Sequence, residues 1–269
     1  MGLAVPAEIE PKEEHIDAAF EEPKLSDQEL RELRHQRAIG RIFFLPLAAF
    51  ILFLLRFIYR IEILGLPEVR SRFVAISKRG KPLVICSNHL TMVDSIIIQC
   101  ALASAWRYLV DYRLLSWNIP AIENYHSKPL WRLITYLGKC IPIDRNGSAD
   151  HTGSVLAKLK FLLSAGETIT IFPEGTRSRT GRVNLDEPGY GIGKIIRSVP
   201  ECEVLCIYLR GRNQTRHSTF PAKGDKMYMD MELVVPERNG RGLRGVRETS
   251  LKILSKIKAM EDKYLSLNA

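Results

Sequence analysis

The stretch VICSNHLTMVD at residues 84–94 decides how this chain is expected to fold. Residues 82–86 form a short apolar run that is typical of a buried strand, and residues 95–106 are apolar on nearly every side, which is typical of a buried helix. His89 and Asp94 therefore fall at a strand-to-helix turn, where α/β sheets usually carry their chemistry.

The spacing of His89 and Asp94 allows two interpretations. Residues five apart on a regular helix point about 140° away from each other, so contact between the two side chains requires a turn that folds the carboxylate back onto the ring. A histidine oriented in this way is a general base with a fixed tautomer. In the alternative, the histidine caps the helix and Asp94 is an ordinary first-turn acid favoured by the helix dipole. The spacing alone leaves both open.

The composition indicates an anionic partner. The 269 residues include 39 Lys and Arg against 30 Asp and Glu, which gives a formal net charge of +9. Such an excess favours nucleic acid, a membrane surface or a phosphorylated ligand. Basic and aromatic residues are rarely interleaved and no zinc-finger or RNP-like motif occurs, so we expect no nucleic-acid partner. The five cysteines are odd in number and lie mostly in apolar runs, which predicts reduced core residues and no metal site.

The N-terminal part of the chain is predicted to form two segments. Residues 1–25 are rich in Pro and Glu and are expected to be disordered or loosely structured. Residues 26–61 are expected to form an amphipathic helix and a membrane anchor. Ser26 is the predicted N-cap and Glu29 closes a capping box, while residues 42–55 contain no charge.

The length of the apolar run leaves its membrane arrangement open. A full span needs about twenty apolar residues, and the run reaches that length only if it continues past Arg56 to Ile61. Arginines flank both ends, so the positive-inside rule gives no orientation. A single tilted span and a helical hairpin that dips into one leaflet are both compatible with the sequence.

Residues 62–269 are predicted to form one domain in which strands and helices alternate. Such alternation indicates an α/β fold with a mixed, largely parallel central sheet covered by helices. The expected strands are 82–87, 107–111, 139–143, 168–172, 203–209 and 227–235. The expected helices are 95–106, 128–137, 152–165, 190–198 and 243–266.

Two further predicted strands end in charged residues. The run IPIDR ends at residue 145, and the run ITIFPEGTRS occupies residues 169–178. If these strands lie side by side, their carboxyl ends converge, and we expect one pocket to contain His89, Asp94, Arg145, Glu174, Thr176, Arg177 and Lys194. Such a pocket would combine a base with phosphate-binding cations, and Gly175 would let backbone amides approach an anion. Arg179 and Arg182 are expected to be solvated surface charges.

In this order and separation, the motifs NHLTMVD, IDR and FPEGTRS resemble those of the glycerolipid acyltransferases, the family of the lysophosphatidate (1-acylglycerol-3-phosphate) acyltransferases. The resemblance covers roughly residues 60–235 and makes residues 62–269 the catalytic domain. It implies that His89 is the general base and that Asp94 orients it. It also implies a substrate-binding set of Asn88, Arg145, Glu174, Gly175, Thr176 and Arg177. No family motif includes His15, His35, His126, His151 or His217.

The resemblance implies transfer of a fatty acyl group to the free hydroxyl of a lyso-glycerolipid, most directly 1-acylglycerol-3-phosphate, giving phosphatidate. Acyl-CoA or an acidic acyl-carrier protein would be the co-substrate, with no other cofactor and no metal. Backbone amides near His89 are the expected oxyanion donors. The partners would be membrane lipids at the cytoplasmic face of an inner or plasma membrane, and the oligomeric state stays open.

Two alternatives remain. The apolar strand VLCIYLR at residues 204–210 lacks the proline usual in the family, so the acceptor could be lyso-ornithine lipid, another lysophospholipid or glycerol-3-phosphate. In the second alternative, the protein is a peripheral membrane protein that binds anionic lipid without chemistry.

Overall fold

The computed structural model describes residues 24–125, 127–186 and 188–267. Its centre is a sheet with the strand order β1-β5-β4-β2-β3. The β4–β5 pair is antiparallel and the other pairs are parallel, which confirms the predicted mixed, largely parallel sheet. The strands are β1 (Glu62–Ile63), β2 (Leu83–Ser87), β3 (Ile169–Ile171), β4 (Glu203–Gly211) and β5 (Lys226–Val234).

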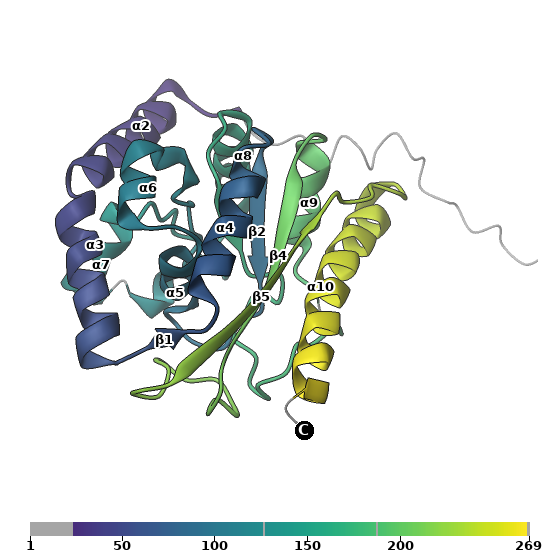
Figure 1. Ribbon diagram of the computed structural model, residues 1–269. Helices are drawn as coiled ribbons and strands as arrows, with labels where there is room; N and C mark the ends of the chain where they lie inside the picture. Colours follow the sequence, from purple (N-terminus) through teal and green to yellow (C-terminus); the bar gives the residue numbers. More distant parts are fainter. Residues whose placement is uncertain (1–23, 126, 187, 268–269) are drawn as a thin grey trace, which may run out of the picture.

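Helices cover both faces of this sheet (Figure 1). Along β2, Val84 packs into one hydrophobic cluster and Ile85 into the other, as the alternation of side chains along a strand requires. The first cluster includes residues of α8 (Ala149–Ser164), α9 (Tyr190–Ser198) and α10 (Gly242–Leu267). The second includes residues of α3 (Phe44–Phe53), α4 (Leu66–Ser77), α5 (Asp94–Leu102) and α6 (Ala105–Val110). The remaining α-helices of the described residues are α2 (Asp27–Ile42) and α7 (Pro129–Leu137).

A loop covers the edge of the sheet that is formed by β3. Strand β3 has only three residues, and its free side pairs with Trp117 through an isolated parallel bridge. The N–H of Trp117 donates to the carbonyl of Thr168 at 2.8 Å, and the N–H of Thr170 donates to the carbonyl of Trp117 at 2.8 Å. The backbone groups of this short edge strand are thereby satisfied.

Close packing of α9 on α10 depends on Gly193. A Cβ at this position would lie 2.1 Å from the carbonyl oxygen of Val246, so only glycine fits. The N–H of Gly193 donates to the Ser250 hydroxyl at 3.1 Å, and that hydroxyl donates to the carbonyl of Gly189 at 2.9 Å. These bonds fix the start of α9, which borders the site described below.

Two predicted strands are wrong. Residues 107–111 lie mostly within helix α6, because Ser104 caps that helix by accepting the N–H of Arg107 at 3.3 Å. The same cap divides the predicted helix 95–106 into α5 and α6. Residues 139–143 form only isolated bridges, at Cys140 and Ile143, and no strand. A short apolar run does not reveal whether a capping residue or a pairing partner lies nearby.

One prediction for the N-terminal segment, its capping box, is confirmed. The capping box at Ser26 and Glu29 is present, whereas the predicted loose segment 1–25 lies almost wholly outside the described residues. No single helix within the described ranges has the length and apolar content to cross a bilayer. Helix α2 meets both criteria only together with α3 and the following π-helical turn η1 (Leu54–Ile58), across a bend of 61°. Membrane association of this segment stays a prediction.

A buried ionic group joins α2 to the rest of the molecule. Glu167 accepts bonds from Arg37 Nε at 2.6 Å, from Lys139 Nζ at 2.5 Å and from Trp117 Nε1 at 3.0 Å. The Gln36 amide of α2 also donates to the carbonyl of Cys140 at 2.9 Å. Helix α2 is therefore anchored to the segment that follows α7.

Candidate active site

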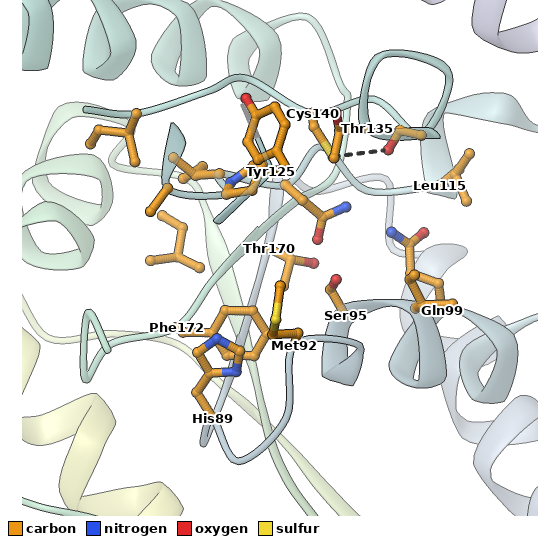
Figure 2. Close-up of a pocket in the computed structure, with 18 of the residues that line it drawn as sticks. His89, Met92, Ser95, Gln99, Leu115, Tyr125, Thr135, Cys140, Thr170 and Phe172 are labelled. Carbon is orange, nitrogen blue, oxygen red and sulfur yellow. Dashed lines mark hydrogen bonds between the residues drawn. The ribbon is translucent and has the colours of Figure 1, made fainter. Parts of the chain in front are cut away.

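A cavity of about 1210 Å³ lies beside the carboxyl ends of β2 and β3. Apolar side chains of α3, α5, α7 and α8 line much of its surface, and His89 borders it together with several cationic residues. Figure 2 shows His89 and Phe172 on one side of the cavity, with Tyr125 and Cys140 on the opposite side. A single cavity thus offers an apolar surface next to ionisable groups.

His89 is oriented by Asp94. Its Nδ1 lies 3.0 Å from Asp94 Oδ2, and its ring stacks on Phe172 with centroids 4.0 Å apart and planes 16° apart. The half-buried imidazole therefore has little rotational freedom, and its Nδ1 is occupied. The structure therefore agrees with the first interpretation of the spacing, in which a turn brings the Asp94 carboxylate into contact with the His89 ring.

The Asp94 carboxylate also organises the turn. Its Oδ2 accepts the N–H groups of Leu90 at 2.6 Å and Thr91 at 2.7 Å, and its Oδ1 accepts the Thr91 hydroxyl at 2.5 Å. Asp94 begins α5 and is buried, where the helix N-terminus favours a negative charge. These bonds fold the carboxylate back onto the ring of His89.

The backbone amides of this turn are not free to bind an oxyanion. The N–H of His89 donates to Glu174, those of Leu90 and Thr91 to Asp94, and that of Met92 to the Thr219 carbonyl. The N–H groups of the next two residues donate to Thr91. The expectation that these amides are oxyanion donors is therefore wrong, because the turn uses them to hold itself together.

Asn88 connects the end of β2 to β4. Its Nδ2 donates to the carbonyl of Leu209 at 2.9 Å, and its Oδ1 accepts the N–H of Leu209 at 2.8 Å. The side chain thus continues the β2–β4 ladder after the backbone has turned away. Asn88 is buried and does not line the cavity.

Glu174 connects the loop after β3 to the turn at His89. Its carboxylate accepts the N–H of His89 at 3.2 Å and also bonds the N–H of Asn184. Burial raises the pKa of Glu174 to about 7, although both N–H bonds oppose that shift. Like Asn88, Glu174 supports the cavity from outside its lining.

The loop after Glu174 presents cations and backbone donors to the cavity. Gly175 has φ +66, a conformation that favours glycine. The Arg145 guanidinium donates to the carbonyl of Gly175 at 2.6 Å, and Arg177 donates to the carbonyl of Ser218 at 3.2 Å. Both arginines, Gly175 and Thr176 line the cavity. This rim has the donor set and the charge to bind a phosphate.

The structure adds residues that the sequence did not single out. Arg179, which is exposed as expected, also lines the cavity, as does His217, to which no motif assigned a role. Lys194, which was predicted, lines the cavity too. Thr91 and Phe172 hold Asp94 and His89 in place. The Thr91 hydroxyl accepts the N–H of Val93, two residues further on, at 3.3 Å, and a threonine at this position was a readable signal for such an ST-turn. Across the described residues, no group of three or more His, Cys, Asp or Glu side chains is arranged to hold a metal ion.

Comparison with known proteins agrees with this geometry. Residues 67–210, more than half of the chain, match the family model described as Acyltransferase. A stretch of 98 residues is 31% identical to an N-acylphosphatidylethanolamine synthase of Arabidopsis thaliana. That stretch is 36% of this chain and 32% of the plant protein, so the chain spans about a third of its matched relative.

Proposed function

The chain belongs to the acyltransferase family, and we propose that it moves a fatty acyl group from a thioester to the free hydroxyl of a lyso-glycerolipid. The observation that carries this proposal is the contact between His89 and Asp94 at the edge of a cavity with apolar and cationic surfaces. A protein that only bound anionic lipid would need the basic rim but would have no use for an oriented imidazole.

The proposed reaction is a direct transfer. With Nδ1 bonded to Asp94, the Nε2 of His89 takes the proton of the acceptor hydroxyl as its oxygen attacks the thioester carbonyl. The tetrahedral intermediate then collapses, the C–S bond breaks, and the leaving thiolate takes the proton from the imidazolium. General-base catalysis of this kind contributes roughly 10²–10⁴-fold to the rate. Asp94 stabilises the imidazolium without itself being protonated.

The acceptor phosphate is proposed to bind at the rim formed by Arg145, Arg177 and the loop at Gly175. The N–H groups of Thr176 and Arg177 have no acceptor within the described parts of the chain, which supports them as anion donors in place of the turn amides. The fatty chain would occupy the apolar part of the cavity. Fixing the phosphate positions the hydroxyl beside His89, and such positioning lowers the activation barrier.

The acceptor we favour is 1-acylglycerol-3-phosphate, with acyl-CoA or an acyl-carrier protein as donor. The plant relative's name indicates a second candidate, in which the attacking group is the amine of an ethanolamine phospholipid and not a hydroxyl. The five cysteines are all free thiols, which supports a reducing environment on the cytoplasmic side of a membrane. Residues 26–61 are proposed to hold the enzyme there.

The test is the fate of a labelled acyl thioester. The full-length protein is incubated with labelled acyl-CoA or acyl-carrier protein and, one at a time, lysophosphatidate, glycerol-3-phosphate, lyso-ornithine lipid, another lysophospholipid and phosphatidylethanolamine. We expect label in phosphatidate, and a turnover lower by roughly 10²–10⁴-fold in His89→Ala. Wild-type turnover by that variant, or no labelled product with any acceptor, would contradict the proposal.

A further inference from the structure

Helix α7 separates the cavity from the outside of the molecule. None of its nine residues is buried, which is unusual for a helix within a folded domain. Trp131, Ile134 and Leu137 line the cavity, whereas Leu130 is 61% exposed and Leu133 is 55% exposed. One side of this helix thus faces the site, and the other presents leucines to the surroundings.

The neighbouring helices also expose large apolar side chains. In α6, Trp106 is 71% exposed. In η1, which follows α3, Phe57 is 64% exposed. Helices α3 and α6 are joined through Phe44, whose ring centroid lies 6.3 Å from that of Tyr108. Figure 1 shows α2, α3, α6 and α7 on one side of the molecule, opposite α10. The exposed members of this apolar face are Ile42, Phe43, Leu45, Phe50, Leu52, Phe53, Phe57, Ile58, Trp106, Val110, Leu130, Leu133 and Tyr136.

Two of the segments that form the apolar face carry charges of one sign, whereas α6 is followed by Asp111, which pairs with Arg113 at 3.0 Å. No Asp or Glu occurs from residue 33 to 61 or from residue 125 to 143. The exposed cations of these two segments are Arg34, Arg41, Arg56, Arg60, Lys128 and Arg132. Apolar side chains bordered by cations, without acids, complement the surface of a bilayer that contains anionic lipid.

We propose that α6 and α7 join α3 in one docking face for an anionic lipid bilayer, so that the leucines of α7 enter the membrane interface. This inference rests on the proposed function for its purpose, since a lipid acceptor would then reach the cavity past α7 without crossing water. It extends the membrane contact beyond residues 26–61 to two helices of the catalytic domain. The occupant is lipid because the two segments that carry most of the exposed apolar side chains are basic and contain no acid, which suits an anionic bilayer better than a second copy of the same basic face.

The test compares Leu130→Ser/Leu133→Ser with a matched control, Leu243→Ser. Leu243 is 54% exposed but lies at the start of α10. Co-sedimentation with vesicles of phosphatidylcholine and phosphatidylglycerol is measured in the absence of thioester. We expect the affinity of the double variant for the vesicles to be lower by about tenfold or more, and Leu243→Ser to bind as the wild type does. Unchanged binding by the double variant would overturn the proposal.

A second measurement uses the fluorescence of Trp106. A folding defect would change this fluorescence with and without vesicles, whereas membrane contact changes it only when vesicles are added. Fluorescence of the full chain is recorded with vesicles, with Trp106→Phe as the reference. We expect a blue shift on adding anionic vesicles that is clearly smaller in Trp106→Phe, where Trp131 of α7 still contributes, and that is weakened by added salt. A shift of undiminished size in that variant would place α6 outside the membrane. Concentration-dependent dimerisation lost in the double variant would replace lipid by a second copy of the chain and overturn the proposal.

Activity toward a dispersed substrate separates the two proposals. The double variant is assayed with a short-chain lyso-lipid below its micellar concentration and with the long-chain acceptor in vesicles. We expect the dispersed substrate to be used as by the wild type and the vesicle substrate at about a tenth of the rate. If neither protein transfers acyl groups, the proposed function fails while vesicle binding still decides the docking face. If the double variant used the vesicle substrate as fast as the wild type does, the proposed role of α7 in membrane docking would be overturned.

Discussion

The turn at residues 88–94 and helix α7 border the same cavity, yet they are held in opposite ways. In the turn, each backbone N–H from His89 to Asp94 has an acceptor within the protein. In α7 no residue is buried. The comparison indicates that the proposed base is held rigidly, as catalytic positioning requires, whereas the side where a lipid would enter is held by few buried contacts and is easier to deform.

The largest effect should follow from breaking the turn at Asp94. Asp94→Asn keeps the size of the side chain but removes the charge that orients His89 and stabilises the imidazolium. We expect acyl transfer to fall on the order of 10²–10⁴-fold, measured as kcat/KM with a saturating thioester. Binding to vesicles should stay as in the wild type. Retention of more than a tenth of the activity would show that the contact does not serve catalysis.

The second prediction contrasts α7 with a helix that is truly part of the core. Helix α10 has ten buried residues, including Leu254. We expect Leu254→Ala to lower the free energy of unfolding by about 2–5 kcal/mol, and Leu133→Ala in α7 to change it by less than about 0.5 kcal/mol. Urea denaturation measures both. Similar losses at the two leucines would mean that α7 belongs to the core and would remove the basis of the comparison.

The third prediction concerns the side chain that extends the β2–β4 ladder. Asn88→Ala leaves the N–H and the carbonyl of Leu209 buried without their partners, so we expect the free energy of unfolding to fall by about 2–4 kcal/mol. Asn239→Ala, at an exposed asparagine, is the control. The role predicted from sequence, that Asn88 binds substrate, is tested by measuring the KM for the acceptor. A raised KM for the acceptor with unchanged stability would show that Asn88 binds substrate.

The smallest effect should come from Glu174 and should depend on pH. Burial raises the pKa of Glu174 to about 7 from an ordinary 4.5, so between these values the native protein binds more protons than the unfolded chain. The native state is therefore stabilised by this group at low pH and loses that contribution as pH rises through about 7. Relative to Glu174→Gln, we expect the free energy of unfolding to fall by roughly 2–3 kcal/mol between pH 5 and pH 8. Urea midpoints at several pH values measure this, and parallel pH profiles for the two proteins would contradict it.

Much of the fold could be predicted because its signals are local and repeated. Strand β4 and helix α10 each have an apolar pattern long enough to identify them. The strands predicted at residues 107–111 and 139–143 are wrong because a short apolar run is compatible with a helix, a strand or a loop. The outcome depends on the cap at Ser104 in the first case and on pairing with residues 118–121 in the second. The element boundaries thus depend on partners that the sequence does not reveal.

The candidate site could be predicted in part, for the same reason. The contact of His89 with Asp94 follows from spacing once a turn is assumed, and the motifs indicated the basic rim. Three features of the site depend on segments that lie far apart in the sequence. They are the hydrogen bonds of the turn amides, the bonds of Asn88 to β4 and the position of Arg179 beside the cavity. Such bonds between side chain and distant backbone have no periodic signature, so only the folded structure reveals them.

The loop that pairs with β3 through Trp117 has a consequence for how the protein is handled. An unpaired edge strand offers a row of donors and acceptors on which other chains can assemble into aggregates. Here that row is occupied by the protein's own loop. Variants in which this loop no longer pairs with β3 should therefore aggregate more readily, and shortened versions of the chain are best designed to keep residues 115–121.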